Sequence, residues 1–190
     1  MVDLKNKIQT AISKFDLNLQ NKTVLTEAAT GNYVVTPIIA AVSGASKVYA
    51  FTNNSKYGTT EEVARQTSNV SEQLGVASQI EVITCLDDIS LNSIDILTNT
   101  GFLRPINKHI INQLSSNCVI PLMWETWEFR ERDLDLDRCR ERKIKVYGTN
   151  EDDERLRTKD YIGLMVVKFL SQHKLSPSNT NVLVLGCDYF

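Results

Sequence analysis

Runs of apolar residues alternate along this chain with segments in which apolar residues recur every three to four positions. The runs predict buried strands, and the recurring pattern predicts amphipathic helices. Strands are expected at residues 23–28, 47–52, 80–84, 94–98, 119–123, 145–147 and 182–185, and helices at about 3–16, 37–44, 59–74, 105–114, 133–142 and 161–170. Strands that alternate with helices indicate an α/β protein with a doubly wound parallel sheet.

Local signals predict where several helices begin and end. Thr36 followed by Pro37 is typical of a helix start, and Pro105 is expected to open the helix after the fourth strand. Thr59 and Glu62 have the spacing of a capping box, and Gly75 supplies a stop after that helix.

Small polar residues, amides, carboxylates and glycines follow five of the expected strands. Because the carboxyl ends of parallel strands meet at one edge of a sheet, these groups should converge on a ligand crevice there. The strand at 119–123 shows the pattern most strongly, because its apolar run stops at Trp124, Glu125, Trp127 and Glu128. Each loop alone also has a structural explanation, since such residues are common in turns and caps.

The candidate site residues follow from this convergence. Glu125 and Glu27 are the candidate catalytic acids or bases, because carboxyl groups at such an edge can exchange protons with a ligand. A surface lid in which Arg130 pairs with a glutamate is the alternative interpretation of the fifth loop. The residues expected to bind substrate are Thr30, Gly31, Ser55, Tyr57, Asn99, Thr100, Gly101, Arg104, Trp124, Glu128, Arg130, Thr149, Asn150 and Glu151.

Composition narrows the classes of function. The hydrophobic fraction of 42% and the formal charge of −2 are typical of a soluble globular protein without the basic excess that nucleic acid requires. The four cysteines lie far apart, no serine-hydrolase, zinc-protease or P-loop motif is present, and so no metal site is predicted. No apolar run approaches membrane-spanning length. We therefore expect a cytoplasmic protein that takes a small-molecule substrate, and whether it forms a homodimer stays open.

From about Asp135 to Phe190 the layout resembles the end of the substrate-binding domain of D-2-hydroxyacid dehydrogenases and related formate- and alanine-dehydrogenase-type proteins. The matching features are the segment CRERKIKVYG, the loop at 149–151, the apolar helix at 161–170 and the segment NVLVLG. The resemblance implies a flavodoxin-like, three-layer α/β/α substrate-binding domain at 1–175. Residues 176–190 would then be a linker and the first strand of an incomplete Rossmann-like domain.

The same resemblance implies an NAD or NADP cofactor, with Gly186 in the turn that approaches its pyrophosphate. Asp188 stands where the second glycine of the G-x-G-x-x-G motif belongs, and its charge would oppose a phosphate. The leading hypothesis is a substrate-binding domain of an NAD(P)-dependent dehydrogenase-like protein that is inactive alone. The alternatives are a stand-alone metabolite-binding domain, and a non-hydride transferase or lyase that uses Glu125 or Glu27.

Overall fold

The computed structural model describes residues 2–176, 178–181 and 183, and the chain divides into two compact units, Met1–Thr149 and Asn150–Phe190. The first unit contains a single sheet of six strands. All pairs are parallel, and the strands are β1 (Thr23–Glu27), β2 (Lys47–Phe51), β3 (Ile80–Ile83), β4 (Ile96–Leu97), β5 (Val119–Pro121) and β6 (Lys145–Tyr147).

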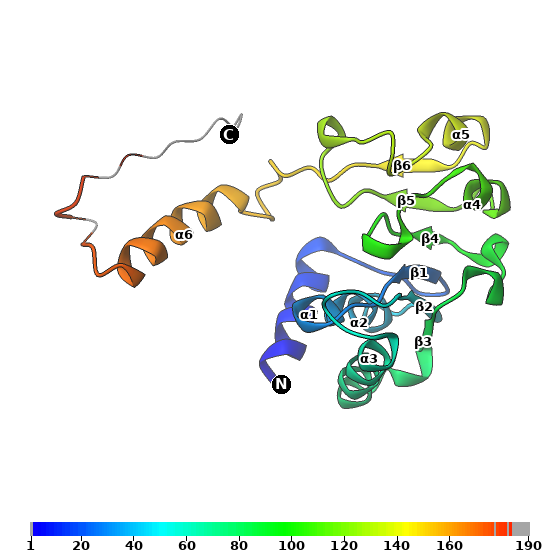
Figure 1. Cartoon of the computed structure of the whole chain (residues 1–190), viewed down its shortest axis with the longest axis horizontal. Helices are drawn as coiled ribbons and strands as arrows, with labels where there is room; N and C mark the ends of the chain where they lie inside the picture. The colour runs from blue at the N-terminus through cyan, green and yellow to red at the C-terminus, as the bar shows by residue number, and fades with distance from the viewer. Residues whose placement is uncertain (1, 177, 182, 184–190) are drawn as a thin grey trace. The chain divides into compact units, whose positions relative to one another are not determined.

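The strand order is β3-β2-β1-β4-β5-β6, which Figure 1 shows from bottom to top. This order confirms the predicted doubly wound parallel α/β class. It is the order of dinucleotide-binding domains, whereas flavodoxin-like sheets have the order 2-1-3-4-5. The chain reverses its direction of travel across the sheet between β1 and β4, so the carboxyl ends of these two strands form the topological switch point.

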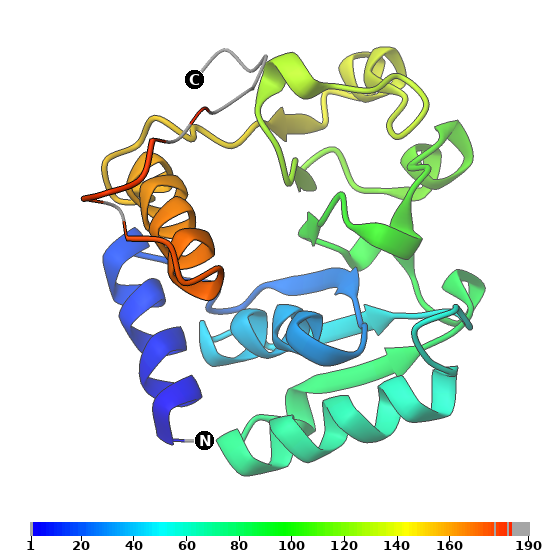
Figure 2. The same cartoon turned by 60° about the vertical axis from the view of Figure 1, so that its left-hand side comes forward.

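Helices cover the sheet on both faces. One face carries α2 (Val35–Val42) and α3 (Thr60–Leu74), which lie together over β1 to β3 (Figure 2). The other face is packed by α4 (Lys108–Gln113) and α5 (Leu136–Glu141), while α1 (Val2–Phe15) contacts α2. Single 3₁₀ turns complete the unit at Gly31–Val34 (η1), Ala77–Gln79 (η2), Leu86–Asp88 (η3), Leu91–Ser93 (η4), Gly101–Leu103 (η5) and Thr126–Glu128 (η6).

Burial on both faces explains the apolar runs of the strands. In β1, Val24 packs with α2 and β2 on one face, and its neighbour Leu25 belongs to the larger core on the other face. Successive side chains of a strand point to opposite faces, so both must be apolar when helices cover both sides.

Two predicted helix starts were wrong by a few residues. α2 begins at Val35, after the extra 3₁₀ turn, and Thr36 lies inside the helix with its hydroxyl donating to the carbonyl of Tyr33. Pro105 lies before α4, whose first turn is instead capped by the side chain of Asn107.

The other predicted helix ends are confirmed. The Thr59 hydroxyl accepts the N–H of Glu62 at 3.2 Å, so this side chain caps α3 as the spacing indicated. Gly75 ends the helix in the left-handed conformation, with φ of 75°, which glycine adopts at little cost.

The second unit is described by itself. Its one described helix is α6 (Thr158–Gln172), which contains the predicted apolar segment at 161–170. The predicted strand at 182–185 lies outside the described residues, apart from Leu183. None of the helices in the described part of the chain is long and apolar enough to cross a membrane.

Candidate functional site

The carboxyl ends of β1, β4 and β5 bring several predicted site residues together. Leu25 pairs with Leu97, which places Glu27 beside Asn99 on the same face of the sheet, and Asn99 in turn forms a bridge with Leu122. We call the group of Glu27, Asn99, Gly101, Arg104, Trp124 and Arg130 the switch-point cluster.

Glu27 joins the loops that follow β1 and β4. Its side chain fills the space over Gly101 so completely that a β-carbon at position 101 would collide with the carboxyl group. The backbone N–H of Phe102 donates a hydrogen bond to this carboxyl. Partial burial raises the pKa of Glu27, and it outweighs the opposing effects of the Phe102 hydrogen bond and the positive charge of Arg104. Glu27 therefore keeps its proton to a higher pH than an exposed carboxyl group.

The guanidinium groups of two arginines lie over the ring of Trp124. The guanidinium carbons of Arg104 and Arg130 lie 5.1 and 5.4 Å from the centre of the ring, within cation–π range. Nη1 of Arg104 also lies 3.6 Å from Oδ2 of Asp133, whereas Arg130 forms no ion pair with a described residue. Asp133 therefore compensates Arg104, and Arg130 remains as the excess cation of the cluster.

Buried polar atoms without partners mark the same place. Asn99 is fully buried, and neither its side-chain oxygen nor its nitrogen has a hydrogen-bond partner within the described part of the chain. The indole nitrogen of Trp124 also has no hydrogen-bond partner among the described residues. Leaving such groups unpaired costs about 1–3 kcal/mol each, so their presence at a strand end indicates a place where something else supplies the partner.

The predicted residues on the loops after β1 and β2 form a separate group. The Thr30 hydroxyl donates to the carbonyl of Tyr57, and the N–H of Gly31 donates to Oε1 of Gln66, both at 3.2 Å. The N–H of Tyr57 donates to the hydroxyl of Ser55 at 3.1 Å. These polar atoms mainly hold the two loops together.

Thr100 does not join the cluster through its hydroxyl. That group bonds to Thr98, which bonds to Thr26, over 3.0 and 2.8 Å, and Thr26 and Thr98 line the opposite face of the sheet. The hydroxyl of Thr100 therefore serves to tie β1 to β4.

The loop after β5 is largely engaged with itself and with the end of β6. The indole N–H of Trp127 donates to the carboxylate of Glu125, and Glu128 ends the short 3₁₀ turn η6. The N–H of Thr149 donates to the carbonyl of Trp124 at 2.8 Å. The loop is therefore held by its own contacts, as in a surface lid, but the ion pair between Arg130 and a glutamate that defines the alternative interpretation is not found among the described residues.

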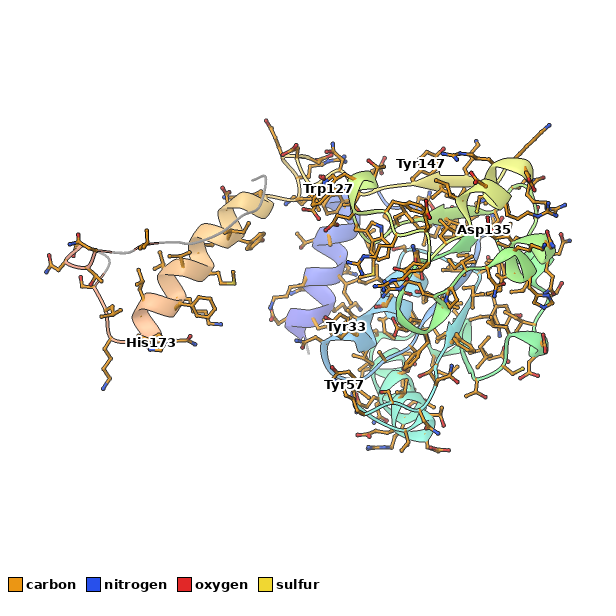
Figure 3. All side chains as sticks on the ribbon, turned by 45° about the horizontal axis from the view of Figure 1, so that its top comes forward. Tyr33, Tyr57, Trp127, Asp135, Tyr147 and His173 are labelled. Carbon is orange, nitrogen blue, oxygen red and sulfur yellow. The ribbon has the colours of Figure 1, made fainter. Side chains whose placement is uncertain are left out.

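Three exposed aromatic side chains, Tyr33, Tyr57 and Trp127, follow the carboxyl ends of β1, β2 and β5 (Figure 3).

Two further predicted residues, Asn150 and Glu151, belong to the second unit, and Gly186 lies outside the described residues. Asp133 is the cluster's partner that sequence reasoning missed, because nothing in its local pattern indicates a contact with Arg104.

Cavities of about 320, 340 and 510 Å³ lie in the described part of the first unit. The cavity of about 320 Å³ lies between the ends of β5 and β6 and helix α5, where Leu122, Thr126 and Gly148 belong to its lining. The cavity of about 510 Å³ lies on the opposite face over β1, β4 and β5, lined mainly by apolar side chains such as Val24, Ile96 and Val119. None of these three cavities is lined by a residue of the switch-point cluster.

The switch point does not fit a dinucleotide, although the strand order is that of dinucleotide-binding domains. Such domains hold a pyrophosphate against a glycine-rich turn and a helix N-terminus after their first strand. Here the turn reads Glu27-Ala28-Ala29-Thr30-Gly31, with a carboxyl group at its first position and the N–H of Gly31 bonded to Gln66. No group of three or more His, Cys, Asp or Glu side chains among the described residues could hold a metal ion.

Comparison with known proteins shows the fold alone. No family model matches the sequence, and no curated protein matches it. Among solved structures, a dipicolinate synthase chain from Bacillus halodurans matches with a TM-score of 0.56 and 16% identity over 87% of this chain and 52% of that chain.

Shikimate 5-dehydrogenase from Listeria monocytogenes, in complex with shikimate and NAD, matches with a TM-score of 0.52 and 12% identity over 76% of this chain and 51% of that chain. The chain spans about half the length of each of these proteins. It therefore has a Rossmann-like α/β fold of the kind found in NAD(P)-dependent dehydrogenases, and the finer resemblance to the D-2-hydroxyacid type stays a prediction.

Proposed function

We propose that the chain contributes the small-molecule binding domain of an NAD(P)-dependent dehydrogenase-like protein and is inactive alone. The observation that carries this proposal is the switch-point cluster, in which a carboxyl group with a raised pKa, an excess arginine and unpartnered buried polar groups meet at one sheet edge. Perturbed groups of this kind gather at ligand sites of open α/β sheets.

In this proposal the nicotinamide cofactor binds outside the first unit. The turn after β1 has a single glycine, Gly31, and its backbone N–H is bonded to Gln66 instead of being open to a pyrophosphate. In the proposal, the cofactor's phosphates are held by a nucleotide domain whose first strand is NVLVLG, with Gly186 at its turn. The cluster of the first unit would bind the substrate.

A thermal-shift screen of the 190-residue chain tests this proposal. The panel comprises 2-oxo acids, 2-hydroxy acids, amino acids and nucleotides. A ligand at about a hundred times its Kd stabilises the folded chain by about 2.7 kcal/mol, which appears as a higher unfolding temperature. We expect the shift to be lost in Glu27→Gln and kept in Glu72→Gln, which removes an exposed carboxylate from α3. A shift that survives Glu27→Gln, or a panel in which nothing binds, would overturn the proposed site.

A second candidate function, a lyase or another enzyme that moves protons without hydride transfer, is favoured by the raised pKa of Glu27. Such an enzyme would exchange the hydrogen next to the carbonyl of a bound 2-oxo acid in deuterated water, with no nicotinamide present. Proton NMR would detect this exchange. Exchange that depends on Glu27 favours the second candidate, and its absence favours a binding domain.

A further inference from the structure

Arg104 lies near two carboxyl groups that are both partly buried. Nη1 of its guanidinium group is 3.6 Å from Oδ2 of Asp133. This distance is too long for a hydrogen bond, and Oδ2 of Asp133 has no hydrogen-bond partner among the described residues. The ion pair is therefore loose, and the guanidinium group keeps donors for a second partner.

Glu27 is the second carboxyl group near Arg104. The positive charge of Arg104 favours the ionised form of Glu27, yet the two side chains form no ion pair in the described part of the chain. The carboxyl group of Glu27 instead accepts the N–H of Phe102 and fills the space over Gly101. Burial opposes its ionisation, and a protonated Glu27 offers Arg104 no charge, which fits the position of the guanidinium group beside Asp133.

Asp133 has a second cation that remains beside it if Arg104 moves. Nε of Arg132 lies 3.8 Å from Oδ1 of Asp133, and the Arg132 side chain is 80% exposed, so it can follow the carboxylate. The charged groups that the described contacts place here are Glu27, Asp133, Arg104, Arg130 and Arg132. Among them, Arg104 is the arginine that interacts with both carboxyl groups.

The ring of Trp124 is sensitive to the position of Arg104. The guanidinium carbons of Arg104 and Arg130 lie 5.1 and 5.4 Å from the centre of the ring, and each cation interacts with its π electrons. Movement of Arg104 alone therefore changes the surroundings of the indole group while Arg130 stays in place.

We propose that Arg104 is a proton-controlled switch, which pairs with Asp133 while Glu27 is protonated and turns toward Glu27 when that carboxyl group ionises. Ionisation puts a negative charge near the guanidinium group in a partly buried place, where the attraction is stronger than in water. The turn weakens the contact with Asp133 and takes the guanidinium group off the ring of Trp124. The switch works in the first unit without a ligand, and so it goes beyond the proposed function.

Tryptophan fluorescence of the full chain between about pH 4 and about pH 8 tests the switch. The chain has two tryptophans, so Trp127→Phe leaves Trp124 as the single emitter. Circular dichroism at each pH checks that the protein stays folded. We expect the emission of Trp124 to change in one transition whose midpoint lies above 4.5, the ordinary pKa of a glutamate side chain.

Variants separate movement of Arg104 from a direct effect of the Glu27 charge on the indole group. Arg104→Gln should abolish the transition, because a charge on Glu27 then has no guanidinium group to move. Arg130→Gln is the matched control, since Arg130 lies over the same ring and should leave the transition in place. Glu27→Gln should also abolish the transition, and Glu72→Gln, which removes an exposed carboxylate from α3, should not.

Asp133→Asn tests the competition between the two carboxyl groups. It should lower the midpoint of the transition by about 0.5–1 pH unit, because Arg104 is then left to Glu27 alone. Asp137→Asn is the control, since Asp137 pairs with Arg140 on the surface and its loss should leave the midpoint unchanged.

The outcomes decide for or against the switch. A Trp124 emission that does not change with pH, or a transition that survives Arg104→Gln or Glu27→Gln, would overturn it. An unchanged midpoint in Asp133→Asn would also overturn it, because the two carboxyl groups would then not compete for Arg104. The proposed function is tested separately by the ligand panel and stands or falls with that result.

Discussion

Arg104 and Asp133 form an ion pair at 3.6 Å with side chains that are only 24% and 15% exposed. Arg104 follows β4 and Asp133 precedes α5, so the pair connects two loops of the site. Asp133→Ala leaves a half-buried cation without its partner. We predict a loss of about 1–3 kcal/mol in the free energy of unfolding, measured by urea denaturation.

The control is Asp137→Ala. Asp137 pairs with Arg140 at 2.7 Å, but both side chains are exposed, so solvent screens the pair and little change is expected. Equal losses of unfolding free energy in Asp133→Ala and Asp137→Ala would contradict the expectation that burial makes the Arg104–Asp133 pair the more stabilising one.

Glu27 should make stability depend on pH. Because its folded-state pKa is raised above the unfolded value near 4.5, the folded protein binds this proton more tightly. Its contribution is fully present below the unfolded pKa and is lost as the pH rises through the folded pKa. Glu27→Gln cannot ionise and keeps an acceptor for the Phe102 N–H.

The stability of Glu27→Gln relative to the unmodified protein should therefore increase as the pH rises from about 4 to about 7. Urea denaturation at each pH measures this difference. Glu72→Gln serves as the control for removal of a carboxylate. A Glu27→Gln difference that stays constant with pH would refute the raised pKa.

Gly101→Ala should be destabilising because of Glu27. The new β-carbon would collide with the carboxyl group of Glu27, and displacing that side chain should cost about 1–3 kcal/mol. A double-mutant cycle with Glu27→Ala isolates the collision, because Gly101→Ala should cost much less when Glu27 is absent. Additive effects would mean that the two residues do not interfere.

The cysteines should differ in reactivity. Burial raises the pKa of the Cys118 thiol to about 12 and that of Cys139 to about 11, so neither forms the nucleophilic thiolate at neutral pH. Cys85 is exposed. Iodoacetamide followed by peptide mapping should modify Cys85 in the folded protein and reach Cys118 and Cys139 only after unfolding. Modification of Cys139 as fast as Cys85 would contradict this.

The sequence predicted the strands well and the helix starts less well, for a physical reason. Burial on both faces leaves a continuous apolar run that any reader of the sequence can find. A helix start depends on one or two side chains, and a 3₁₀ turn before α2 and an asparagine before α4 each moved it. The resemblance led us to expect a flavodoxin-like fold, but the strand order found is 3-2-1-4-5-6. Local sequence patterns do not predict this order, because it is set by packing between distant segments.

The edge that carries the candidate site also followed from the sequence, because polar residues after parallel strands must gather there. The sequence did not predict which of these residues contact one another. The contacts of Glu27 with the loop after β4, and of Arg104 with Asp133, join segments far apart in the chain. The side chain of Glu125 was expected to face a ligand, yet it accepts a hydrogen bond from Trp127 in its own loop.

The packing of Glu27 over Gly101 has a consequence for evolution. A homologue that keeps glutamate at position 27 has no room for a side chain at position 101, whereas one with a short residue at 27 lacks this collision and keeps only the backbone strain of a positive φ there. The two positions should therefore covary, and glycine at 101 should be a marker of homologues that retain the carboxyl group.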